Sequence, residues 1–204
     1  MLLASGGLDS TTLAYWLVVN GEDFAPLFVD YGQHCAAREL ATLRAVLPPS
    51  HRDRITSINI SDVYRGTPSR LIDEPDLWRD AITHEDLHLP YRNLLLLTTA
   101  AAYAQARSMH TVYAAFINSN HALELDCSAA FFETLHSVLT AYGSVEVRMP
   151  FRSMSKAEVA QIGIGLGAPV AQTFSCQAQS SIPCGACPNC VDRLEALRHL
   201  AGGS

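Results

Sequence analysis

The chain has 204 residues, of which 49% are hydrophobic, and its formal net charge is −6. This length supports one substantial core, or one domain with a small appendage. This negative net charge provides no positive electrostatic field for holding a polynucleotide, so nucleic acid is not expected as a partner and small-molecule chemistry is favoured. Residues 1–4 lack a basic leader region, and the most apolar stretch, Leu94–Ala106, is too short to span a bilayer. We therefore expect a cytoplasmic protein that does not enter the membrane.

Strands and helices are predicted to alternate along the chain. The expected strands are Leu2–Ala4, Ala25–Val29, Ile55–Ile60, Thr111–Ile117 and Val145–Met149. The expected helices are Leu8–Val19, Cys35–Leu47, Asn93–Arg107, Ser128–Tyr142 and a last helix that opens with a capping box at Ser155–Glu158 and ends near Gly167. The polar stretch 61–90 predicts an excursion or a flexible lid rather than core. These repeats indicate an α/β fold, a parallel sheet with helices on both faces, whose ligands lie beyond the carboxyl ends of the strands.

A glycine-containing loop follows the first expected strand, where residues 5–10 are Ser-Gly-Gly-Leu-Asp-Ser. Two glycines at a strand-to-helix junction allow φ > 0 and close backbone approach, so several N–H groups can converge on an anion at the positive end of the helix dipole. The residues assigned to this anion site are Ser5, Gly6, Gly7, Leu8, Asp9, Ser10 and Thr11. The alternative is an ordinary glycine turn with a helix cap. The Walker loop and the three-glycine dinucleotide fingerprint are both absent.

Further candidates stand beside other expected strand and helix ends. Asp30, which begins Asp-Tyr-Gly-Gln after the second strand, can contact a ribose or magnesium, or it can simply cap the next helix. Arg92 and Lys156 are cations placed to grip phosphate or carboxylate, although solvated surface charges are the usual role of such residues. Cys127 lies where a loop leaves a strand, and a thiol there is more often inert than reactive. Two histidines beside motif loops, His34 and His121, are weaker candidates.

Four late cysteines, Cys176, Cys184, Cys187 and Cys190, have the spacing of a metal site. Four thiolates complete a tetrahedral Zn²⁺ site, and a site closed by four sulfurs has a structural use. An iron–sulfur cluster takes the same ligands, so the spacing leaves it open. Cys35 stands apart in the sequence and is expected to be a buried small side chain. We predict a nucleotide-binding domain over residues 1–170 and a zinc-binding segment over residues 171–204.

Residues 5–10 resemble the PP-loop of the ATP pyrophosphatases. Together with Asp30–Gln33, Pro90–Asn93, Asp126–Cys127, Ser155–Glu158 and the cysteines, they resemble the 7-cyano-7-deazaguanine synthases over nearly the whole chain. The resemblance implies ATP, Mg²⁺ and Zn²⁺ as cofactors, with adenylation of 7-carboxy-7-deazaguanine and conversion by ammonia to an amide and then a nitrile. It also implies catalytic roles for Asp9, Arg92 and Lys156. The substrate contacts that it implies are Tyr31, Gln33, Asn118, Asp126 and Cys127.

One segment departs from that family. Its synthases generally have a longer stretch, Asn-Ala-x-Asp-Tyr-Ser-Gly-Tyr-Pro-Asp-Cys-Arg, where this chain has residues 118–128 without the acid, the aromatics and the terminal Arg. We expect the nitrile step to be weakened. A related ligase that joins the acid to another amine, such as one on a protein acceptor, is an alternative, as are a tRNA-modifying PP-loop enzyme and a zinc-binding adaptor. A homodimer is left open.

Overall fold

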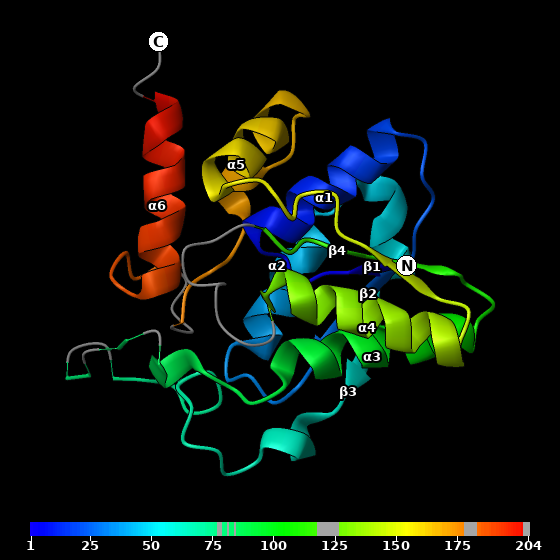
Figure 1. The fold of residues 1–204 in the computed structure, drawn as a ribbon. Helices are drawn as coiled ribbons and strands as arrows, with labels where there is room; N and C mark the ends of the chain where they lie inside the picture. The colour runs from blue at the N-terminus through cyan, green and yellow to red at the C-terminus, as the bar shows by residue number, and fades with distance from the viewer. Residues whose placement is uncertain (77–78, 81, 84, 118–126, 178–182, 202–204) are drawn as a thin grey trace.

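The computed structural model describes residues 1–76, 79–80, 82–83, 85–117, 127–177 and 183–201. At its centre lies a five-stranded sheet with the order β3-β2-β1-β4-β5, in which every pairing is parallel. The strands are β1 (Leu2–Leu3), β2 (Pro26–Asp30), β3 (Thr56–Asn59), β4 (Thr111–Ala114) and β5 (Glu146–Arg148). The expected α/β fold is confirmed, with helices on both faces of the sheet (Figure 1).

The central strands are apolar on both sides, as a sheet covered on both faces requires. Leu2 and Phe28 belong to the core on one face, while Leu27 and Val29 belong to the core on the other. Leu2 and Leu27 are fully buried. Strand β4 is shorter than the predicted Thr111–Ile117, because its pairing with β5 ends at Tyr113 and residues 115–117 leave the sheet.

The first face carries α1 (Leu8–Val19), α2 (Ala36–Val46) and α5 (Lys156–Gly165), with α6 (Pro188–Ala201) packed outside α5 (Figure 1). Helix α5 lies against α1, and a Cβ added at Gly163 would collide with the Thr12 hydroxyl. The predicted capping box is confirmed, because Ser155 and Glu158 each accept a hydrogen bond from the other's backbone N–H. This cap fixes the start of α5 and therefore the position of Lys156.

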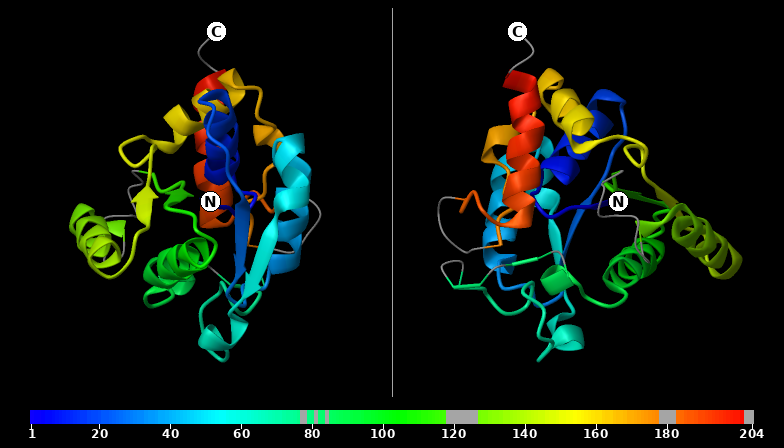
Figure 2. Two further views of the ribbon diagram at one scale, coloured as in Figure 1. Left: turned by 90° about the vertical axis from the view of Figure 1, so that its right-hand side faces the viewer. Right: turned by 60° about the vertical axis from the view of Figure 1, so that its left-hand side comes forward.

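The second face carries α3 (Arg92–Gln105) and α4 (Ala129–Tyr142). Figure 2 shows these two helices together on the side of the sheet away from α1, α5 and α6. Ala100 and Ala104 of α3 pack on the sheet, and Phe132 and Leu135 of α4 close the layer. Within the described ranges, no helix combines the length and apolarity that crossing a membrane requires.

Two parts of the chain differ from the sequence prediction. The excursion between β3 and α3 contains three-residue and four-residue 3₁₀ turns, but Tyr64, Leu71 and Leu89 form a small buried cluster there, against which Tyr31 packs. It is therefore partly core, which was missed because these three side chains are too scattered to form a periodic pattern. Helix α6 was not anticipated either. Pro188 suits its first position, where a missing N–H costs nothing.

Candidate active site

A cavity of about 270 Å³ opens at the carboxyl ends of β1, β2 and β4. Parallel sheets place their ligand sites at this edge. The predicted site residues that line it are Ser5, Gly7, Asp9, Ser10, Tyr31, Gln33 and Arg92. Glu39 and Asn93 also line it, together with apolar residues that include Phe28, Leu96 and Phe116. The cavity wall therefore combines polar residues from the glycine loop, from residues 31–39 and from the start of α3 with apolar residues from β2, α3 and the stretch after β4.

The glycine loop is shaped by one glycine rather than two. Gly6 has φ +79°, and a Cβ there would lie 2.7 Å from the Leu43 backbone nitrogen. Gly7 instead has an extended backbone, at φ −72° and ψ 165°, and forms the N-cap of α1 without a side-chain cap. The first turn of α1 therefore has N–H groups that no side chain of the cap satisfies, which suits an anion.

Not every predicted loop residue faces the cavity. Leu8 is buried in the core, so it can serve a ligand only through its backbone. Thr11 is fully buried and is not part of the cavity wall. Its hydroxyl has no hydrogen-bond partner among the described residues. The hydroxyls on the ligand side are therefore those of Ser5 and Ser10, and Ser10 also holds the turn by donating to the Gly7 carbonyl at 3.3 Å.

Asp9 and Lys156 meet across the packed helices α1 and α5. The Lys156 Nζ lies 3.7 Å from the Asp9 Oδ2, and each side chain is 24% exposed. Burial raises the pKa of the Asp9 carboxyl, and the neighbouring Lys156 partly opposes that rise. The other oxygen of this carboxylate, Oδ1, is buried and has no hydrogen-bond partner within the described chain. A buried carboxylate oxygen of this kind is suited to a metal ion or a donor on a ligand.

Tyr31, Gln33 and Arg92 surround the opposite side of the cavity. Burial raises the pKa of the Tyr31 phenol, and Arg92 acts on it in the opposite direction. Gln33 is buried, and its Oε1 accepts from the Tyr31 N–H at 2.9 Å. The structure thus brings Arg92 next to the residues predicted to contact the substrate, although Arg92 begins α3 and Tyr31 lies in the loop after β2.

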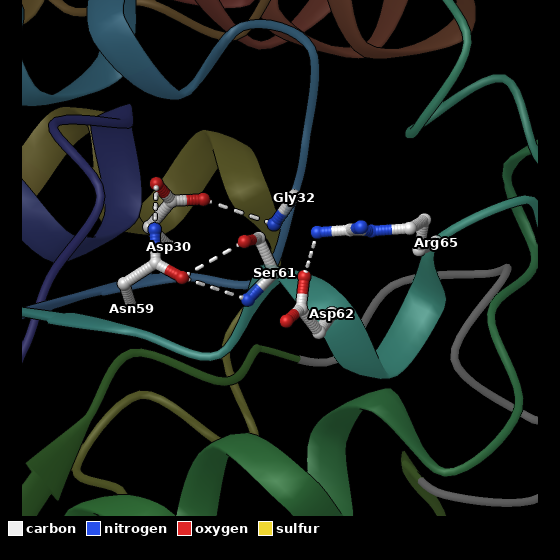
Figure 3. A network of polar contacts seen from close by, with 6 residues as sticks. All are labelled: Asp30, Gly32, Asn59, Ser61, Asp62 and Arg65. Atoms are coloured by element: carbon white, nitrogen blue, oxygen red, sulfur yellow. Dashed lines mark hydrogen bonds and ion pairs between the residues drawn. The ribbon is translucent and has the colours of Figure 1, made fainter.

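Asp30 is engaged in a turn (Figure 3). Its Oδ1 accepts from the Gly32 N–H at 2.9 Å, and its Oδ2 accepts from the Asn59 Nδ2 at 3.1 Å. Asn59 in turn accepts from Ser61, while Asp62 pairs with Arg65. Asp30 is outside the cavity wall, so this geometry matches the turn interpretation more closely than the nucleotide contact.

Of the other predicted substrate residues, Cys127 lies beside the cavity. Its Sγ accepts from the Nδ2 of Asn93, which is buried in the cavity wall. Asn118, Asp126 and His121 lie outside the described residues. Asn93 and Glu39 were not singled out from the sequence. Asn93 stands in the quoted Pro-Tyr-Arg-Asn motif, whereas Glu39 resembles any acidic residue in the first turn of a helix.

The four predicted metal ligands come together. The sulfur atoms of Cys176, Cys184, Cys187 and Cys190 lie within 4.8 Å of one another. Backbone N–H groups point at these sulfurs, from Cys184 to the Cys176 Sγ at 3.3 Å and from Cys187 to the Cys184 Sγ at 3.3 Å. N–H donors stabilise thiolates, so the cluster fits a four-sulfur metal centre.

The cysteine cluster is joined to the glycine loop. The Phe174 N–H donates to the Gly6 carbonyl at 3.1 Å, two residues before Cys176. Cys35, at the start of α2, is buried against the cluster, as expected for a small apolar side chain. Arg193 of α6 is buried and donates to the carbonyls of residues 170, 171 and 173. The C-terminal segment thus fixes the back of the anion loop.

These features define a class: α/β proteins with a glycine anion loop at the first strand and a four-cysteine centre behind it. The family model described as Queuosine biosynthesis protein QueC matches residues 1–201. The chain belongs to the QueC family.

Two relatives show the extent of the similarity. The chain is 29% identical to the 7-cyano-7-deazaguanine synthase of Methanospirillum hungatei, over 97% of this chain and 94% of that protein. It is 35% identical to the enzyme of the same name from Hahella chejuensis, over 95% of this chain and 85% of that protein. Among solved structures, one described as a predicted subunit of tRNA methyltransferase from Methanocaldococcus jannaschii shares 14% identity at a TM-score of 0.48, covering 85% of this chain and 90% of that one.

Proposed function

We propose that this chain is an ATP-dependent ligase that activates the carboxylate of 7-carboxy-7-deazaguanine and converts it with ammonia to the amide and then to the nitrile, 7-cyano-7-deazaguanine. Membership of the QueC family and the names of the relatives support the substrate and product. The observation that carries the proposal is the cavity itself, which has an anion loop on one side and Arg92 on the other.

The reaction begins with activation of the carboxylate. A carboxylate is a poor electrophile, so its oxygen attacks the α-phosphate of ATP, pyrophosphate leaves, and an acyl-adenylate forms. Negative charge grows on the phosphate oxygens, where the N–H groups of the Gly6–Gly7 turn and the positive end of α1 stabilise it. Ser5 and Ser10 add hydroxyl donors on the same side. Ammonia then displaces AMP to give the amide, and a second ATP drives the dehydration to the nitrile.

Asp9, Lys156 and Arg92 have distinct roles in this proposal. Arg92 grips the carboxylate or the phosphate bidentately. Lys156 neutralises the charge that accumulates beside Asp9, with which it is paired. The buried Asp9 Oδ1 is suited to hold Mg²⁺, which supplies charge neutralisation for the triphosphate. Zn²⁺ in the four-cysteine centre has a structural role, since four sulfurs leave no open position.

The test follows products by mass spectrometry after incubation with ATP, Mg²⁺, 7-carboxy-7-deazaguanine and ammonium. We expect AMP and pyrophosphate to form only when the acid is present, together with the amide and the nitrile. Because residues 118–128 lack the first Asp and the terminal Arg of the family's stretch, the amide is expected to exceed the nitrile. Failure to release pyrophosphate in response to the acid would contradict the proposal. Nitrile formed as fast as pyrophosphate would contradict only the weakened second step.

A further inference from the structure

A second carboxylate faces the cavity besides that of Asp9. Glu39 lies in the first turn of α2, is partly buried, and belongs to the cavity wall. Its Oε2 accepts a hydrogen bond from the Gln33 Nε2 at 2.9 Å. Because the Gln33 Oε1 is already occupied by the Tyr31 N–H, the amide has one orientation, and its NH₂ group must face Glu39. The carboxylate is therefore held in place rather than free to turn into solvent.

The groups around Glu39 come from three elements. Arg92 of α3 attracts it, the Cys35 thiol before α2 hydrogen-bonds to it, and Asp30 at the end of β2 repels it. The Tyr31 phenol faces the same groups. Arg92 is the one cation in this set, and we have placed it on the reacting carboxylate or phosphate. Glu39 is thus held next to the group that grips the reacting atoms.

The negative charge of Glu39 does not suit either of the two substrates of adenylation. ATP and the deazaguanine acid are both anions, and an anion beside them costs free energy unless it serves a donor. Asp9 has Lys156 as its partner and lies on the α1 side. The remaining carboxylate among the described lining residues is suited to the participant that brings N–H donors and must lose a proton, which is the amine.

We propose that Glu39 is a catalytic residue of amide formation, the step that follows adenylation. In this step Glu39 binds the incoming ammonia and accepts its proton. This inference rests on the proposed function. The nitrogen lone pair forms the C–N bond, the C–O bond to AMP breaks, and its electron pair leaves on the AMP phosphate. One N–H proton passes to the Glu39 carboxylate, which returns it to solvent, so atoms and charge balance.

The setting of Glu39 suits a base. Burial raises the pKa of its carboxyl, while Gln33, the Cys35 thiol and Arg92 oppose the rise. A base works best when its pKa approaches the working pH, and burial moves this carboxyl in that direction.

The experiment measures adenylation and amide formation separately in Glu39→Gln. This variant retains the shape of the side chain and its ability to accept a hydrogen bond from Gln33. Exchange of labelled pyrophosphate into ATP, driven by the acid without ammonia, reports adenylation. Amide formation is measured against ammonium concentration and pH. We expect exchange within about threefold of the wild type, since the anion loop is untouched, and amide formation lower by about 10²-fold, the usual contribution of a general base. The exposed Glu195→Gln is the control and should change neither rate.

Two results would overturn the inference. One is amide formation by Glu39→Gln at the wild-type rate with an unchanged pH profile. The other is an equal loss of exchange with a raised KM for the acid, which would assign Glu39 to the purine instead. If Glu39→Gln does not fold, Glu39→Asp decides, since a shortened base should slow amide formation and spare exchange. A wild-type protein without exchange would refute the adenylation step itself, and this inference with it.

Discussion

The glycine loop and the cysteine cluster adjoin each other, but they differ in how far hydrogen bonds satisfy their polar atoms. In the loop region, the Asp9 Oδ1 is buried without a hydrogen-bond partner in the described structure, and the cap of α1 has no side-chain bond. In the cluster, backbone N–H groups are directed at the sulfurs, and Arg193 satisfies three carbonyls beside it. The loop region leaves polar groups open to a ligand, while in the cluster the chain itself directs donors at the four sulfurs, an arrangement that would suit a metal ion held permanently.

Substitutions should therefore separate stability from activity. Changes in the cluster should unfold the segment that supports the loop, and changes in the loop should stop the chemistry of a folded protein. The Phe174–Gly6 hydrogen bond joins the two, so some loss of activity should accompany damage to the cluster.

The largest effect on folding is expected for Cys187→Ser. A missing thiolate opens the four-sulfur centre, and we expect the bound zinc, about one ion per chain, to be lost together with roughly 4 kcal/mol or more of the free energy of unfolding. For a chain of this length that corresponds to a fall in Tm of about 10 °C. Elemental analysis and calorimetry check both values. A chelator should reproduce the effect in the wild type, and Cys127→Ser, which lies outside the four-cysteine cluster, should not. Iron with visible absorbance in place of zinc would contradict this assignment.

Asp9→Asn should reverse that pattern. Without the charge that faces the triphosphate, pyrophosphate release should fall by about 10²-fold or more. The pKa of Asp9 is raised by burial, so the folded wild type binds its proton more tightly than the unfolded chain and loses stability as pH rises from about 4 through the folded pKa. The variant should lack this loss and be at least as stable at neutral pH.

The matched control is Asp53→Asn, because Asp53 is an exposed carboxylate away from the cavity. Ser5→Ala should also abolish most pyrophosphate release while the protein stays folded. Release at the wild-type rate from either folded loop variant would exclude the loop from the reaction.

Gly6→Ala tests the contact between the loop and α2. The new Cβ would lie 2.7 Å from the Leu43 nitrogen at a φ of +79°, so backbone must move. We expect a loss of about 2 kcal/mol or more in the free energy of unfolding. Gly21→Ala has a similar φ of +74° with nothing within 4 Å, and it measures the conformational cost alone. Equal losses in the two variants would show that the contact with α2 is unimportant.

The smallest effect is expected for Ser155→Ala, which removes the capping box of α5. Loss of an N-cap costs about 1 kcal/mol. Because Lys156 is the first residue of this helix, fraying should also displace its ammonium from Asp9 and lower pyrophosphate release several-fold. Denaturant unfolding and the release assay measure the two effects. Glu158→Gln keeps a capping acceptor and should be nearly silent, so a large effect there would count against the cap.

The sequence predicted the elements whose signals are local. The helix starts at residues 8 and 156, the five strands and the cysteine spacing were all visible because each depends on neighbours along the chain. Helix α6 and the buried cluster of the excursion were missed, since their apolar residues are explained only by partners on other elements. The roles assigned to individual site residues remain predictions.

The glycine loop and the four clustered cysteines could be recognised from the sequence alone, because glycine conformations and metal-ligand spacings are short-range properties, and the same motifs carried the resemblance to the family. Tertiary structure alone decided which charges meet. It paired Asp9 with Lys156, set Asp30 into a turn with Asn59, and placed Glu39 beside Arg92 in the cavity. None of these pairings can be read from the local sequence, because the partners lie far apart along the chain and meet only when the parallel strands bring separate segments to one edge of the sheet.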